Sequence, residues 1–156
     1  MTQQLSKEGL HAWKGLLIAH AALLETINRE MISKGFVALD WYDVLLALEE
    51  APQNKLKMSE LADQVLLSKS GLTRLLDKMT AAGLIERKAC TADRRVAYAS
   101  LTPKGLRARE EGWPTYREAI HQHFASHMTA QEAKIVGDVL LRFTGRFRPR
   151  GSCGGS

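Results

Sequence analysis

The chain of 156 residues contains only two cysteines, four prolines and no long apolar run. Cys90 and Cys153 are too few and too far apart for a disulfide framework or a zinc site. No apolar stretch approaches the roughly 20 residues that span a bilayer. The N-terminal residues lack the basic and then apolar pattern of a signal peptide. We therefore expect neither a disulfide-stapled secreted protein nor a membrane protein, but a cytoplasmic one.

Residue groupings that mark enzymes are also missing. There is no Ser-His-Asp set, no glycine-rich nucleotide loop, no metal-ligand spacing and no carboxylate pair with an evident role. The sequence therefore predicts a protein that is not an enzyme and that holds no cofactor and no metal.

Positive charge, in contrast, is plentiful in one segment. The whole chain carries a net charge of +5. Residues 1–67 have 6 Lys/Arg against 9 Asp/Glu, residues 68–109 have 10 against 3, and residues 110–156 have 6 against 5. The excess of positive charge thus lies in the middle segment, as expected of a surface that binds a polyanion.

The same segment contains a helix with two different faces. At about 100° per residue, Leu72, Leu75, Leu76 and Met79 fall on one side, which is the spacing of a packed helix. The other side carries short hydroxyl groups and basic side chains, the types that reach base edges and phosphates in a major groove. Its members are Lys69, Ser70, Thr73, Arg74, Asp77 and Lys78. The pattern is typical of a DNA recognition helix.

Hydrophobic periodicity and helix-end signals predict six helices and one hairpin. In order, they are helices over 10–31, 40–50, 59–66 and about 70–82, strands over 84–89 and 96–101, a fifth helix that opens at Thr102 and Pro103, and a last helix that begins after Thr129 and ends near Phe147. A short extended piece is expected at Leu56 and Lys57, before the third helix. The fold class is mainly α with a small β-hairpin, a winged helix-turn-helix. We expect a DNA-binding lobe over 36–105, dimerisation helices over 8–34 and 103–148, and a disordered tail over 149–156.

Several residues mark the predicted helix ends. Asp40 is a plausible N-cap of the second helix, and Ser68 or Ser70 of the fourth. Gly35 and Gly83 should end the first and fourth helices. A further set opens the last two helices, namely Thr102 with Pro103, and the capping box Thr129 with Glu132.

Five motifs in this order resemble the multiple-antibiotic-resistance regulator (MarR) family. They are Leu61-Ala62, the run Ser70 to Met79, the run Gly83 to Arg87, Asp93-Arg94-Arg95, and the run Leu101 to Gly105. The resemblance implies a dimeric transcription regulator, usually a repressor, that binds a pseudo-palindromic operator. In this family many members lose DNA affinity when a small anionic or phenolic compound binds, and some when a cysteine is oxidised.

The resemblance and the helix pattern together give a set of candidate DNA contacts. Ser70, Thr73 and Arg74 should face bases, because a guanidinium bonds guanine through two hydrogen bonds. Asp77 should either orient Arg74 or accept from a cytosine amine. The remaining candidates are Lys69 and Lys78 on phosphates, Ser68 at the start of the helix, and Arg94 and Arg95 at a wing tip in the minor groove.

Candidate effector residues follow from the position that ligands take in this family, where the dimer helices meet the DNA-binding lobe. The aromatic and histidine side chains of the corresponding segments are Trp13, His20, Trp41, Tyr42, Trp113 and Tyr116. An aromatic wall with a histidine would suit a phenol or an aromatic carboxylate. Core packing is the alternative for each of these residues.

The sequence thus predicts a homodimeric repressor that a small aromatic or phenolic ligand releases from DNA. Two alternatives remain open. One is an architectural DNA-binding protein without a ligand, recognised by steep salt dependence and little sequence preference. The other is a redox regulator that uses Cys90, next to the basic Arg87 and Lys88, although family members with redox sensing place the cysteine near the first helix.

Overall fold

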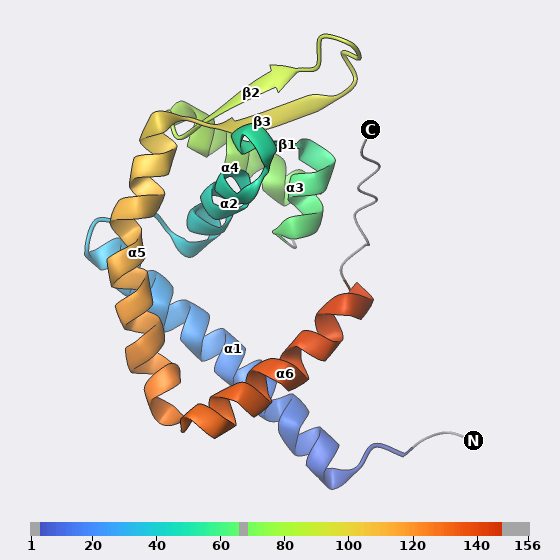
Figure 1. Ribbon diagram of the computed structural model, residues 1–156, viewed down its shortest axis with the longest axis vertical. Coiled ribbons are helices and arrows are strands. Elements are labelled where there is room, and N and C mark those ends of the chain that lie inside the picture. Colours follow the sequence, from blue (N-terminus) through green and yellow to red (C-terminus); the bar gives the residue numbers. More distant parts are fainter. Residues whose placement is uncertain (1–3, 66–68, 148–156) are drawn as a thin grey trace.

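The structure of the protein is a computed structural model that describes residues 4–65 and 69–147 (Figure 1). Ser68 and the predicted tail over 149–156 lie outside the described residues. The elements are α1 (Lys7–Ser33), α2 (Leu39–Glu50), η1 (Pro52–Asn54), β1 (Lys55–Lys57), α3 (Met58–Gln64), α4 (Lys69–Ala81), β2 (Ile85–Ala89), β3 (Ala97–Leu101), α5 (Pro103–His123), η2 (Ala125–His127) and α6 (Ala130–Phe147). Within this part of the chain no helix is both long and apolar enough to cross a bilayer.

The elements form a lobe and an extended helical arm (Figure 1). The lobe holds α2, α3, α4 and the sheet, and the β2–β3 hairpin projects from it. The arm holds α1, α5 and α6, which extend away from the lobe toward the opposite end of the molecule. The packing of α1 and α2 against α5 joins the two parts.

The predicted hairpin is part of a three-stranded antiparallel sheet. β2 pairs with β3, with Ile85 opposite Leu101 and Ala89 opposite Ala97. The short β1 adds to the other edge of β3, where Leu56 lies opposite Ala99. Both of these residues are buried, so β1 brings an additional apolar side chain into the lobe core.

The lobe core confirms the buried face predicted for the recognition helix. Leu72, Leu75, Leu76 and Met79 of α4 are all buried. They belong to one cluster with side chains of α2, α3 and the sheet, including Leu45, Leu48, Leu61, Leu84, Ile85 and Ala99. Burial of one face fixes the rotation of α4, so its polar face is turned away from the lobe.

Both predicted glycine stops are confirmed. Gly35 has φ +83° and Gly83 has φ +75°, a conformation that costs other residues free energy. After α1, the N–H groups of Gly35 and Phe36 donate to the carbonyls of Ile32 and Met31. Gly83 and Leu84 repeat this arrangement after α4, with the carbonyls of Thr80 and Met79. Each glycine therefore closes its helix and turns the chain back.

The predicted N-cap of α2 is wrong. α2 begins at Leu39 after Ala38, so Asp40 lies inside the first turn and its carboxylate accepts from the Trp41 N–H at 2.8 Å. The Leu39 N–H donates instead to Oδ1 of Asn28 on α1, at 2.9 Å. α4 begins at Lys69, so of the two candidate caps Ser70 lies within the helix, and Ser68 lies outside the described residues. The acceptor for the first N–H of α2 therefore comes from a side chain of α1, and not from a residue adjacent in sequence as the N-cap rule predicts.

The predicted starts of the last two helices are confirmed. The Thr102 side chain accepts from the Gly105 N–H, with Pro103 at the first position of α5. At α6, Thr129 and Glu132 form the expected reciprocal pair: the Thr129 N–H donates to Glu132, and the Glu132 N–H donates to the Thr129 hydroxyl.

Candidate DNA-binding surface and ligand cleft

The polar face of α4 points away from the lobe core. Thr73, Arg74, Asp77 and Lys78 are exposed, in contrast to the buried leucines between them. Lys69 and Ser70 occupy the first turn of the same helix. The helix therefore presents a row of hydroxyl, guanidinium, carboxylate and ammonium groups to solvent, while its other face anchors it.

The turn between β2 and β3 presents the two predicted wing arginines. Arg94 and Arg95 are exposed, and the Arg95 side chain is 92% accessible. Oδ1 of Asp93 accepts from the Arg95 N–H at 3.0 Å and from Arg95 Nε at 3.3 Å. Asp93 therefore orders the turn.

A cleft of about 500 Å³ separates α3 and α4 from the base of the wing. Its polar lining combines Lys57, Ser59, Thr73 and Arg95, over a floor that includes Leu72 and Val96. Sequence reasoning missed Lys57 and Ser59. No local signal distinguishes them from other exposed polar residues, and only the pairing of β1 with β3 brings them to the wing.

Asp77 forms an ion pair with Arg87 of β2. The two sequence alternatives for Asp77 were orientation of Arg74 and acceptance from a base. The observed contact joins the recognition helix to the first wing strand, and both side chains remain partly exposed, at 55% and 34%. Arg87 therefore belongs to the same surface, although sequence reasoning did not single it out.

The start of α5 holds the end of the recognition helix. The Thr102 hydroxyl donates to the Gly83 carbonyl at 2.7 Å, and Lys104 Nζ donates to the Ala82 carbonyl at 2.8 Å. A Cβ at Gly105 would stand 2.1 Å from the Leu84 carbonyl oxygen. Close approach of α5 thus requires glycine, and it couples the position of α4 to the arm.

A second link joins α2 to α5. Glu49 and Arg109 form an ion pair in which both side chains are largely covered, at 25% and 17% exposure. Burial raises the pKa of the neighbouring Tyr42 hydroxyl, against the opposing effect of its hydrogen bond with Arg109. This half-buried network fixes the lobe on α5.

The six predicted effector residues do not form one site in the single chain. Tyr42 and Tyr116 meet edge to face, with ring centroids 4.9 Å apart, and Trp113 lies 6.2 Å from Tyr116. Trp41 packs against the lobe core. Trp13 and His20 are exposed on α1. Of the six, the structure therefore brings together only Tyr42, Trp113 and Tyr116.

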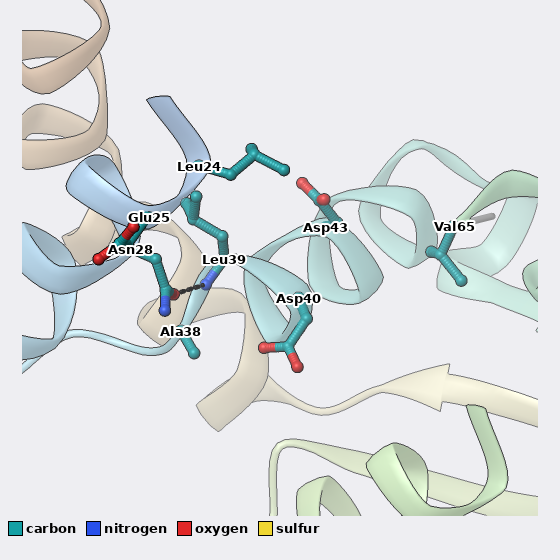
Figure 2. Close-up of a pocket in the computed structure, with 8 residues that line it drawn as sticks. All are labelled: Leu24, Glu25, Asn28, Ala38, Leu39, Asp40, Asp43 and Val65. Atoms are coloured by element: carbon teal, nitrogen blue, oxygen red, sulfur yellow. Dashed lines mark hydrogen bonds between the residues drawn. The ribbon is translucent and has the colours of Figure 1, made fainter. Parts of the chain in front are cut away.

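A separate cleft of about 440 Å³ opens where α1 meets α2 (Figure 2). None of the six predicted effector residues lines it; the lining residues are Leu24, Glu25, Asn28, Ala38, Leu39, Asp40, Asp43 and Val65. Its size suits a small organic ligand. Because α1 belongs to the arm and α2 to the lobe, a ligand here would contact both.

Cys90 lies where β2 leads into the wing. It is half-buried, and its N–H donates to the Val96 carbonyl at 2.7 Å across the base of the turn. A change at this residue would therefore affect the wing directly.

Three helices with a wing, an anchored recognition helix and a basic outward face define a winged helix-turn-helix regulator. A family model described as "MarR family" matches residues 36–96. Over this segment, which is most of the lobe, the chain is similar to MarR family transcriptional regulators, as the sequence motifs predicted.

Known relatives agree with this assignment. The chain is 27% identical over 113 residues to the transcriptional repressor MprA of Escherichia coli K12, covering 72% of this chain and 64% of that one. It matches the crystal structure of AbsC, a MarR family regulator of Streptomyces coelicolor, with a TM-score of 0.82 and 25% identity over 94% of this chain and 99% of that one. Sco3205 of the same organism, solved in complex with DNA, gives a TM-score of 0.86 at 22% identity, over 98% and 96%.

Proposed function

We propose that this protein is a homodimeric repressor that binds a pseudo-palindromic operator through α4 and the wing. The observation that carries the proposal is the polar face of α4, on which Thr73 and Arg74 are exposed and Thr73 lines one cleft with the wing residue Arg95. Arg74 reads a base in the major groove, Arg94 and Arg95 enter the adjacent minor groove, and Lys69 and Lys78 bind phosphates. The DNA complex of Sco3205 and the repressor activity in the name of MprA support this assignment.

Dimerisation follows from an apolar surface that the single chain leaves uncovered. The seam predicted on α1 is buried at Ile27 and Met31, where α1 packs against α2 and α5, but it is exposed toward the N-terminus. The exposed apolar residues on the two arm helices include Leu10, Trp13, Leu17 and Leu24 of α1, and Ile135, Val139, Leu140 and Phe143 of α6. A second copy would cover them and set the two recognition helices about 34 Å apart, one helical turn of DNA.

The proposed switch is a small aromatic ligand that binds between the arm and the lobe. A ligand that prefers one orientation of the lobe relative to α1 and α5 would change the spacing of the two recognition helices. A coupling free energy of about 1–3 kcal/mol is enough for such a switch. The cleft between α1 and α2 supports this proposal because it contacts both parts.

The decisive experiment selects bound sequences from random DNA and then tests variants on the selected operator. We expect a symmetric motif. Arg74→Ala should lower the affinity for the operator at least tenfold, and it should relax the base preference mainly at one position of each half-site. Arg95→Ala should also lower affinity at least tenfold while the dimer stays folded by circular dichroism.

Arg117→Ala is the matched control, because it removes the same charge from an exposed site on α5. Its affinity for the operator should equal that of the wild type. If the selection instead yields no symmetric motif, and if the affinity for DNA falls steeply with salt whatever the sequence, the architectural alternative is supported. Wild-type affinity in both Arg74→Ala and Arg95→Ala would refute the proposed surface.

A further inference from the structure

Directional contacts attach the lobe to α5 at two separate points. The first lies at the start of α5, where Thr102 and Lys104 donate to backbone carbonyls just after α4. The second lies at the end of α2, where Glu49 forms an ion pair with Arg109. Thr102 and Arg109 are seven residues apart, which is about 10 Å along a helix. Two attachments at this separation prevent the lobe from turning about either one alone.

Around these two points, α5 presents small residues to the lobe. A Cβ at Gly105 would stand 2.1 Å from the Leu84 carbonyl oxygen, and one at Gly112 would stand 3.6 Å from the Tyr42 ring. Ala108, one turn from each glycine, packs against the lobe core. Glycine and alanine permit close approach, but packing of this kind has no preferred direction. The hydrogen-bonded groups are therefore the ones that select an orientation.

The pair of Glu49 and Arg109 is poorly suited to add stability. Both side chains are largely covered, so pairing requires the loss of their water. Glu49 Oε2 and Arg109 Nε are buried and make no hydrogen bond within the described part of the chain. A buried pair that leaves such atoms unsatisfied contributes little to the net free energy of folding. What it does provide is a direction, because a planar guanidinium accepts only a narrow set of carboxylate positions.

Arg109 contacts α2 at two places. The hydrogen bond with Glu49, against the opposing effect of burial, raises the pKa of the Arg109 guanidinium, and the hydrogen bond with Tyr42 raises it further. Arg109 therefore stays charged and bonds two groups of α2 that are seven residues, or about two helical turns, apart. These two hydrogen bonds set the direction of α2 relative to α5.

We propose that Glu49 and Arg109 are positioning residues for operator binding, whose pair holds the lobe in the orientation that matches one spacing of the two half-sites. The inference rests on the proposed function, a dimer that reads two half-sites. Since α4 belongs to the lobe and the second copy attaches through the arm, the angle between the lobe and α5 determines how far apart the two recognition helices lie. One base pair of spacing moves a half-site by about 3.4 Å along the duplex and by roughly 35° around it. A fixed lobe therefore excludes the neighbouring spacings.

The test measures operator affinity as a function of half-site spacing. Two duplexes differ from the selected operator by one base pair more, or one fewer, between the half-sites. We expect the wild type to bind both at least tenfold more weakly than the selected operator. The double variant Glu49→Met with Arg109→Met should bind the selected operator about three to ten times more weakly, because only a fraction of its molecules has the matching orientation. Its further loss on the altered spacings should be less than about threefold.

The apolar double variant separates orientation from stability. Replacement of a buried ion pair by apolar residues of similar size is often neutral or stabilising, so urea denaturation should show a midpoint no lower than that of the wild type. If the double variant does not fold, Glu49→Gln replaces it; this change removes the charge, keeps the size and should broaden the spacing profile to a smaller extent. Arg107→Met with Glu110→Met is the matched control, because it removes the same two charges from exposed positions of α5. The control should keep the wild-type profile.

Two results would overturn the proposal. One is a wild type that binds an altered spacing as tightly as the selected operator. The other is a folded variant, the double variant or Glu49→Gln, whose affinity falls by the same factor on all three duplexes or does not fall at all. Failure of the proposed function looks different, since the wild type would then yield no symmetric operator in the selection.

Discussion

Single residues decide how closely the recognition helix is held to the arm. Thr102 and Lys104 donate to the last carbonyls after α4, and Gly105 lets the α5 backbone approach the Leu84 carbonyl. The motif from Leu101 to Gly105 was found in the sequence through a family resemblance. Its physical role is to fix the end of α4 on the start of α5.

The substitution Gly105→Ala should therefore destabilise the fold. An added Cβ would stand 2.1 Å from the Leu84 carbonyl oxygen and 2.9 Å from the Leu101 side chain, so the backbone must shift. We expect a loss of about 2–3 kcal/mol in the free energy of unfolding, measured by urea denaturation at fixed protein concentration. Gly15→Ala on α1 is the control, because its Cβ would meet nothing within 4 Å. The control should be neutral or stabilising by up to about 1 kcal/mol; equal losses in both variants would contradict the close-approach explanation.

At the scale of elements, contacts between helices supply hydrogen-bond acceptors and counter-charges that a helix does not provide for itself. Asn28 of α1 accepts from the first N–H of α2, and Glu49 of α2 pairs with Arg109 of α5. Glu30 of α1 accepts from Lys34 at 2.8 Å and lies 3.0 Å from His123 Nε2 at the end of α5. These contacts hold the arm to the lobe and the arm helices to one another.

The Glu30 contacts predict a pH dependence of stability. The hydrogen bond from Lys34, and then that from His123, lowers the pKa of the Glu30 carboxyl below its ordinary value of 4.5. The folded state therefore binds this proton less readily than the unfolded state does. The resulting stabilisation is present above pH 4.5 and is lost as the pH falls through the lowered folded-state value.

We expect Glu30→Gln to reduce the free energy of unfolding by about 1 kcal/mol at pH 7. The difference from wild type should shrink once the pH falls below 4.5, as measured by urea denaturation between pH 7 and pH 3. Glu118→Gln, at an exposed site on α5, should leave the stability nearly unchanged at every pH. A Glu30→Gln deficit that stays constant across this range would show that the charge of Glu30 is not the cause.

At the scale of the whole molecule, the arm is built for contact with something outside the chain. The seam of α1 is covered only near its C-terminal end, and α6 exposes apolar side chains along its length. Since exposed apolar patches of this extent are rare on monomers, the arm supports the proposed dimer.

Leu17→Glu should dissociate that dimer, because it would bury a charge in the apolar interface. Leu17 is 49% exposed in the single chain, so the protomer itself should still fold. Sedimentation velocity should show a shift from dimer to monomer, and operator affinity should fall at least tenfold. His11→Glu is the matched control, about 120° around α1 from Leu17, and should remain dimeric. A dimer of unchanged affinity in Leu17→Glu would place the interface elsewhere.

The sequence by itself determined the features that depend on neighbours along the chain. The buried face of α4 follows from the spacing of Leu72, Leu75, Leu76 and Met79, and the helix ends at Gly35 and Gly83 follow from the left-handed conformation that glycine accepts. The wing turn that carries Asp93 and the similarity to the MarR family were also evident from local motifs.

Only the tertiary structure decided the features that join distant segments. It moved the cap of α2 from Asp40 to Asn28, gave Asp77 a partner in Arg87, added β1 to the sheet and brought Lys57 to the wing. It also formed a carboxylate-lined cleft that the aromatic pattern did not indicate. A donor or a charged group pairs with the acceptor or counter-charge that lies nearest to it in space. Helix packing, and not spacing in the sequence, determines which group that is.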